Sequence, residues 1–152
     1  MISPEVLRRF SLFAGLDPDM FKELAMAGEE VDLSADEWLF EEGADADGLY
    51  LILSGKVELT INLDEAGKRK ADLTTLVEGD VAGWSALVEP YVYTLGAKAA
   101  SDTKVVKLDG EELREKMTAN PEMGLLLMHR LAQALGQRLN NLRVQFISLT
   151  ES

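Results

Sequence analysis

One stretch of the chain, residues 79–100, contains residue types and spacings that could hold an anion: GDVAGWSALVEPYVYTLGAKAA. It begins with Gly79-Asp80, reaches another glycine at Gly83, and passes Pro90 before a run of small residues. This outline is typical of a loop that presents backbone N–H groups to a phosphate. No arginine lies in the stretch, so a phosphate bound here would lack the charge-assisted partner that such sites commonly supply.

The composition excludes several other kinds of site. The chain of 152 residues has no cysteine and a single histidine, His129. Disulfides, thiolate zinc sites and iron–sulfur clusters all need cysteine. A catalytic triad or a metal site of several histidines is equally hard to build from one histidine. We therefore expect a protein that is not an enzyme and holds no metal.

The charge argues against nucleic-acid partners. The formal charge is −12, with 27 acidic residues against 15 basic ones. Such a surface repels phosphate backbones. The one basic cluster, Lys68-Arg69-Lys70, follows Gly67 and is interpreted as a solvated hairpin tip.

The apolar runs are too short to cross a membrane, and the first residues lack the layout of a secretion signal. We expect a cytoplasmic protein without a membrane partner.

The length predicts one domain over residues 1–152, and the hydrophobic period divides it into three parts. In residues 1–30, Ser3-Pro4 and Asp17-Pro18 predict the starts of two helices, the second of them ended by Gly28. Residues 31–108 show period-two alternation interrupted by Gly-containing turns, which predicts an eight-stranded antiparallel barrel. Clear strand-like segments are 37–40, 49–53, 57–63, 73–77, 91–95 and 103–108.

Residues 109–152 are predicted to form a short helix and a long one. Asp109 and Glu112 make a capping pair for the short helix, and Asn120-Pro121 begins the long one. The long helix carries a 4-3 repeat that predicts dimerisation through this helix. The residues of this predicted dimer interface are Met128, Ala132, Leu135, Leu139, Leu142, Phe146 and Leu149.

This order of elements, together with the glycine positions, resembles the cyclic nucleotide-binding domain family, which includes the catabolite-activator and FNR-like regulators. The segments that carry the resemblance are 7–16, 37–43, 49–59 and Gly79-Asp80. The resemblance implies a mainly β fold: a double-stranded β-helix, or jelly roll, with two N-terminal helices and a short plus a long C-terminal helix.

In that family the stretch we began with corresponds to the phosphate-binding cassette. Gly83, Ala86 and Pro90 match the family pattern, but Trp84 stands where a glutamate takes the ribose 2′-hydroxyl, and Tyr91 stands where an arginine pairs with the phosphate. Lys98 has the opposite strand parity to Tyr91, so we do not expect it to replace that arginine. The candidate ligand site comprises Gly83, Trp84, Ser85, Ala86, Pro90, Tyr91 and Val92.

The resemblance therefore implies a dimeric regulatory domain in which cAMP or cGMP binds weakly or is replaced by another small molecule. An altered ligand would lie against an aromatic pocket of Trp84, Tyr91 and Tyr93, with the N–H groups of Ser85 and Ala86 available for a carboxylate. Alternatively, Trp84 plugs the pocket and the domain is a ligand-free interaction module. A third alternative is a regulatory subunit that binds cAMP weakly.

Some relatives in this family bind haem, which here would need His129 as its axial ligand, and we do not expect haem. Transcription factors of the family carry a helix-turn-helix after the long helix, whereas this sequence stops at Ser152. We therefore expect a stand-alone sensor domain, read by a partner protein rather than by DNA.

Overall fold

The computed structural model describes residues 1–151, and its N-terminal part is helical. Helices α1 (Pro4–Leu7) and α2 (Pro18–Ala25) are separated by the 3-10 helix η1 (Ser11–Phe13). Asp17 caps α2 by accepting the Met20 N–H at 2.9 Å, as the Asp-Pro pair predicts. Gly28 does not end this helix: it opens the first strand, three residues before the boundary drawn from the sequence.

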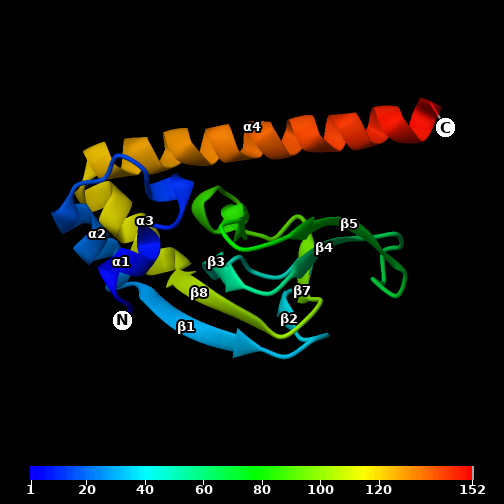
Figure 1. Ribbon diagram of the computed structural model, residues 1–152, viewed down its shortest axis with the longest axis horizontal. Helices are drawn as coiled ribbons and strands as arrows, with labels where there is room; N and C mark the ends of the chain where they lie inside the picture. Colours follow the sequence, from blue (N-terminus) through cyan, green and yellow to red (C-terminus); the bar gives the residue numbers. More distant parts are fainter. Residues whose placement is uncertain (152) are drawn as a thin grey trace.

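Within residues 1–151, eight antiparallel strands form two sheets of four, which confirms the predicted barrel architecture (Figure 1). One sheet has the order β1-β8-β3-β6 and the other β2-β7-β4-β5. The strands are β1 (Gly28–Leu33), β2 (Trp38–Phe40), β3 (Gly48–Ser54), β4 (Val57–Asn62), β5 (Lys70–Leu76), β6 (Val81–Ala82), β7 (Gly96–Ala99) and β8 (Thr103–Asp109).

The predicted strand over residues 91–95 is wrong. Tyr91 has φ of +57°, in the left-handed region, and its N–H donates to the Val88 carbonyl at 3.0 Å, so the chain turns here. A single bridge, Asp45 to Val92, replaces the expected ladder, and the strand β7 starts only at Gly96. The tight turn before Tyr91 accounts for the shift.

Two hydrophobic cores share strand β3. Its residues Leu49, Leu51 and Leu53 belong to a core that also contains the helices, which we call the helix-side core. Tyr50 and Ile52 point the other way, into the interior between the sheets, which we call the barrel core. Alternating side chains thus bury both faces of β3, which explains why the sequence from Leu49 to Leu53 is continuously apolar.

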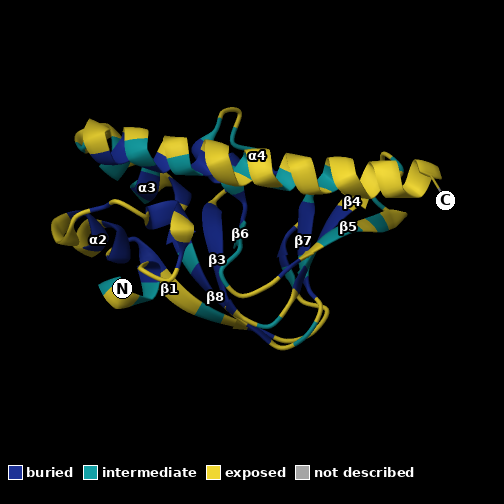
Figure 2. Ribbon diagram, turned by 45° about the horizontal axis from the view of Figure 1, so that its top comes forward, coloured by how far each residue is buried: buried dark blue, intermediate teal, exposed yellow. Residues whose placement is uncertain are grey.

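Helices α3 (Gly110–Ala119) and α4 (Pro121–Glu151) complete the fold. Asp109 caps α3 by accepting the Glu112 N–H at 2.9 Å, as predicted. Helix α4 runs along the outside of the barrel and continues past it (Figure 1). Its first half buries Met123, Leu127 and Leu131, whereas its second half is largely exposed (Figure 2).

The seven residues of the predicted dimer interface take up two orientations on α4. Leu135 and Leu142 are half-buried and line a cavity against the barrel of their own chain. Met128, Leu139 and Phe146 are 37%, 70% and 67% exposed, and Ala132 and Leu149 are exposed as well. The exposed members, which we call the exposed stripe, lie beside the barrel-facing side of α4. Their exposure does not itself test dimerisation through α4, which stays a prediction.

Candidate ligand-binding site

The loop singled out from the sequence folds as a strand, a tight turn and an extended return. Strand β6 leads into Gly83, and the 3-10 helix η2 (Trp84–Leu87) follows. Gly83 has φ of +88°, and a Cβ at this position would lie 2.8 Å from the Gly48 carbonyl oxygen. The turn therefore needs glycine both for its left-handed backbone and for its close approach to β3.

The backbone of the turn is partly occupied by its own hydrogen bonds. The Ala86 N–H donates to the Gly83 carbonyl at 3.0 Å. It is therefore not available to a ligand, contrary to the expectation from the sequence. Ser85 is buried and lines a small cavity below the turn. Pro90 is exposed after a cis Glu89–Pro90 bond, and Val92 is half-buried beside Asp45.

The interior of the barrel next to the turn is filled by two stacked rings. Phe40 and Tyr93 lie with centroids 3.7 Å apart and an interplanar angle of 11°. The Tyr93 hydroxyl donates to the Gly48 carbonyl at 2.6 Å and accepts the Gly48 N–H at 3.1 Å. The remaining cavity, lined by Phe40, Gly83, Ser85 and Tyr93 among others, measures only about 10 Å³, room for about one water molecule at most.

Burial keeps the Tyr93 hydroxyl protonated. Desolvation raises the pKa of Tyr93 well above its ordinary value, and the Asp47 carboxylate contributes in the same direction. The Tyr93 ring is thus a neutral wall of the barrel core, hydrogen-bonded to β3.

Trp84 lies on the other side of the turn. Its half-buried indole packs against the helix-side core and lines both the small cavity and a larger one beneath α4. Tyr91 and Tyr93 pack with the barrel core. The three aromatic residues therefore do not form the single pocket expected from the sequence, and the rings that fill the barrel are Phe40 and Tyr93.

Two arginines from the C-terminal helices reach the turn. Arg114 on α3 donates to the Ala86 carbonyl at 2.8 Å, and its guanidinium lies 4.1 Å from the centroid of the Tyr91 ring. Arg138 on α4 donates to the Val81 carbonyl at 2.7 Å. Burial lowers the pKa of Arg138 from its ordinary value, and Asp80 opposes that shift.

Sequence reasoning missed both arginines. Arg138 falls seven residues after Leu131 and three after Leu135, so the helical period alone places it on the barrel-facing side of α4. Lys98, the cation considered from the sequence, lies elsewhere: its ammonium is 3.6 Å from Asp36 and 5.5 Å from the centroid of the Trp38 ring.

His129 lies away from the turn. It is exposed and lines a groove with Asp17, Met20 and Leu125 at the junction of α2 and α4. Within residues 1–151, no group of three or more histidine, cysteine, aspartate or glutamate side chains is placed to hold a metal ion. No helix in the same range has the length and apolar character needed to cross a bilayer.

Comparison with known proteins agrees with this fold. The family model described as "Cyclic nucleotide-binding domain" matches residues 30–120. The chain is 30% identical over 143 residues to the CRP-like cAMP-activated global transcriptional regulator of Mycobacterium tuberculosis, covering 91% of this chain and 61% of that protein. The chain thus spans only part of the length of this relative.

Two solved structures resemble most of the chain. A putative cyclic nucleotide-binding protein from Geobacter metallireducens GS-15 superposes with a TM-score of 0.82 at 36% identity, covering 91% of this chain and 99% of the other. The N-terminal domain of a transcriptional regulator from Streptomyces coelicolor A3(2) gives 0.69 at 31% identity, covering 88% and 94%. The fold and the site define a jelly-roll regulatory domain. The chain belongs to the cyclic nucleotide-binding domain family.

Proposed function

We propose that this chain is a non-enzymatic regulatory domain that works as a dimer through α4 and does not bind cAMP or cGMP tightly. The observation that carries the proposal is that aromatic side chains occupy the cassette and fill the barrel interior behind it. Trp84 and Tyr91 occupy the two positions at which the family contacts the nucleotide, and the Phe40–Tyr93 stack leaves a cavity of only about 10 Å³ behind the turn. Ligand binding would reposition α3 and α4, and a partner protein would recognise the new position of these helices.

The magnitudes support weak nucleotide binding. A hydrogen bond to a charged group contributes about 1.5–3 kcal/mol. Losing one to the phosphate and one from the ribose would weaken binding by several powers of ten, since each 1.4 kcal/mol is tenfold. Arg114 reaches the turn with one Nη atom on the Ala86 carbonyl and its guanidinium over the Tyr91 ring, so titration with a nucleotide also tests whether this cation offsets the loss.

Titration calorimetry with cAMP and with cGMP tests the proposal. We expect no saturable heat below about 1 mM nucleotide, an affinity weaker than about −4 kcal/mol. A dissociation constant in the micromolar range or lower, for either nucleotide, would show that the cassette still accepts its family ligand. The protein would then be a cAMP-binding or cGMP-binding regulatory subunit.

A second candidate function is a ligand-free interaction module. The small cavity behind the turn favours it, since a pocket filled by its own side chains needs no ligand to be stable. The two candidates differ in whether any small molecule raises the melting temperature of the protein. A screen that finds none, while a partner protein binds the apo dimer, would favour the interaction module.

A further inference from the structure

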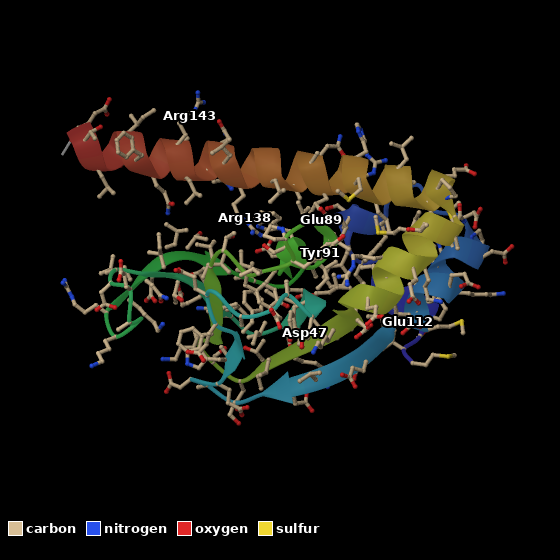
Figure 3. All side chains as sticks on the ribbon, turned by 180° about the vertical axis from the view of Figure 1, so that it is seen from behind. Asp47, Glu89, Tyr91, Glu112, Arg138 and Arg143 are labelled. Carbon is tan, nitrogen blue, oxygen red and sulfur yellow. The ribbon has the colours of Figure 1, made fainter. Side chains whose placement is uncertain are left out.

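A groove lies where the first turns of α4 meet the start of α2 (Figure 1), and we call it the α2–α4 groove. It has a volume of about 520 Å³. Figure 3 shows Glu89 and Tyr91 of the cassette loop beneath the central turns of α4, away from the first turns of that helix. The α2–α4 groove is therefore a surface of the helical part of the domain, separate from the cassette turn.

The apolar part of the groove comes from both helices. Met20 of α2 is buried, Leu126 of α4 is half-buried, and Leu125 is 74% exposed. Gly15 lies between η1 and α2, and a Cβ at this position would lie 3.3 Å from a methyl group of Leu126. The missing side chain thus leaves the surface beside Leu126 open. A concave apolar surface between two helices suits the apolar side of a third helix.

The polar part of the groove is acidic. Asp17 and Glu122 line it together with His129, and among the described residues no lysine or arginine does so. Asp17 caps α2 through Oδ1, which accepts the Met20 N–H. Within residues 1–151, the Glu122 side chain makes no hydrogen bond or ion pair, so its carboxylate can pair with a cation from outside.

One cation borders the groove, and it does not reverse the charge. A Cβ on Gly15 would lie 3.5 Å from an Nη atom of Arg130. This guanidinium donates to the Ala14 carbonyl at 3.1 Å and to the Gln133 side chain at 2.9 Å. Two carboxylates against one guanidinium leave the groove negatively charged.

The charge of the groove indicates what covers it. A second copy of this chain would bring a formal charge of −12 to an acidic surface, so repulsion disfavours it. A negatively charged lipid surface is disfavoured for the same reason. A basic segment is complementary in charge, and complementary charges increase both the rate and the specificity of association.

We propose that the α2–α4 groove binds a short amphipathic helix of a partner protein, with its apolar side against Leu125 and its lysine or arginine residues beside Asp17 and Glu122. This inference rests on the proposed function, because it gives the partner protein of that proposal a docking surface and a chemistry. Since α2 and α4 both line the groove, any movement of α4 relative to α2 would change its shape, and the partner would bind more or less tightly.

A suitable probe is an acetylated and amidated peptide of about 14 residues, with leucine and alanine on one side of a helix and lysine on the other. Titration calorimetry should show one peptide bound per chain with a dissociation constant below about 100 μM in 20 mM NaCl. The affinity should fall at 200 mM NaCl, because salt screens the charges. A matched peptide with glutamate in place of every lysine should bind about tenfold or more weakly.

Two substitutions in the groove have matched controls outside it. Leu125→Ala should weaken the lysine peptide about tenfold, as the loss of a central apolar contact does. Glu122→Gln should weaken it about two- to fivefold, since an exposed ion pair contributes little. Leu139→Ala and Glu115→Gln make the same changes at exposed positions of α4 and α3 that do not line the groove, and both should leave the affinity unchanged.

Equal losses of affinity in the groove variants and in their controls would overturn the proposal. Equal affinity for the lysine and glutamate peptides, or no saturable binding up to 1 mM, would overturn it too. So would a peptide affinity that falls as the protein concentration rises, because a second copy would then occupy the groove. Tight binding of cAMP or cGMP would instead overturn the proposed function, while the Leu125 and Glu122 variants would still test the groove.

Discussion

Gly83 places the cassette turn against strand β3, and its backbone cannot accept a side chain without strain. In Gly83→Ala, the energetic cost of the left-handed φ adds to the cost of the close contact between the new Cβ and the Gly48 carbonyl oxygen, 2.8 Å away. We expect the free energy of unfolding to fall by about 2–3 kcal/mol, measured by urea denaturation.

Gly43→Ala is the control for this substitution. Gly43 has a similar φ of +89° but nothing within 4 Å of the added Cβ, so only the backbone cost of about 1 kcal/mol applies. If both variants lost the same stability, the close approach of Gly83 to β3 would be irrelevant.

Tyr93 gives the stability a characteristic dependence on pH. The folded protein holds the phenolic proton to a higher pH than the unfolded chain does, because the pKa of Tyr93 is raised by burial. The unfolded chain therefore binds fewer protons above about pH 10, and the free energy of unfolding falls as the pH rises through that range.

In Tyr93→Phe this part of the pH dependence should disappear, while the ring still stacks on Phe40. At pH 7 the variant should be about 1–2 kcal/mol less stable, because the Gly48 N–H and carbonyl lose their partner. Urea denaturation at pH 7, 9 and 10.5 measures both effects. Parallel curves for the two proteins across pH 9–10.5 would contradict the assignment.

The sequence indicates some residues of the cassette turn and not others. Gly83, Trp84 and Tyr91 are candidates because the cassette is continuous in the chain, so its matches and departures can be compared position by position, and their role in ligand binding stays a prediction. Arg114 and Arg138 reach the turn from 28 and 57 residues away in sequence. No local pattern in the cassette indicates them, since their position depends on how the helices pack on the barrel.

At the scale of elements, α4 divides into a part that its own barrel covers and a part that it does not. Leu131 is 4% exposed, whereas Leu139, eight residues on, is 70% exposed. The 4-3 repeat predicts a helix, which is confirmed, and a single apolar seam for dimerisation. It could not separate the barrel-facing residues from the exposed stripe, because both sides of α4 are apolar and lie next to each other.

Leu139→Glu tests whether the exposed stripe joins two chains. We expect self-association to weaken by about tenfold or more, since a buried apolar contact would be replaced by an unpaired charge. Monomer stability should hardly change. The control is Val144→Glu, which places the same charge on another exposed side of α4, where Val144 is 56% exposed. Sedimentation velocity would count against this interface if the two variants behaved alike.

The strands were predicted well where the apolar pattern is bounded by clear turn signals and poorly where the chain turns sharply. β4 lies where the alternation predicted it, and β3 and β8 lie where short apolar segments between turn signals predicted them. The segment 91–95 does not form a strand, because Tyr91 has a left-handed backbone. A pattern of apolar and polar residues does not indicate that backbone conformation.

For the whole molecule, the net charge of −12 should govern how two copies meet. If the α4 interface is apolar, the long-range term between the chains is repulsive, and salt screens it within a Debye length of about 10 Å at 0.1 M. We expect dimerisation to strengthen several-fold between 20 and 200 mM NaCl. A weaker dimer at high salt would point to an interface held by ion pairs.

The contact of Arg114 with the Ala86 carbonyl and the Tyr91 ring has a consequence for hydrogen exchange. Breaking the cassette turn also frees Arg114, so the turn and α3 should open as one cooperative unit. Amides of η2 and of α3 should then share a common opening free energy, which Arg114→Met would split into two values. Mass spectrometry of exchanging peptides measures these opening free energies, and two separate values in the unmodified protein would contradict the coupling.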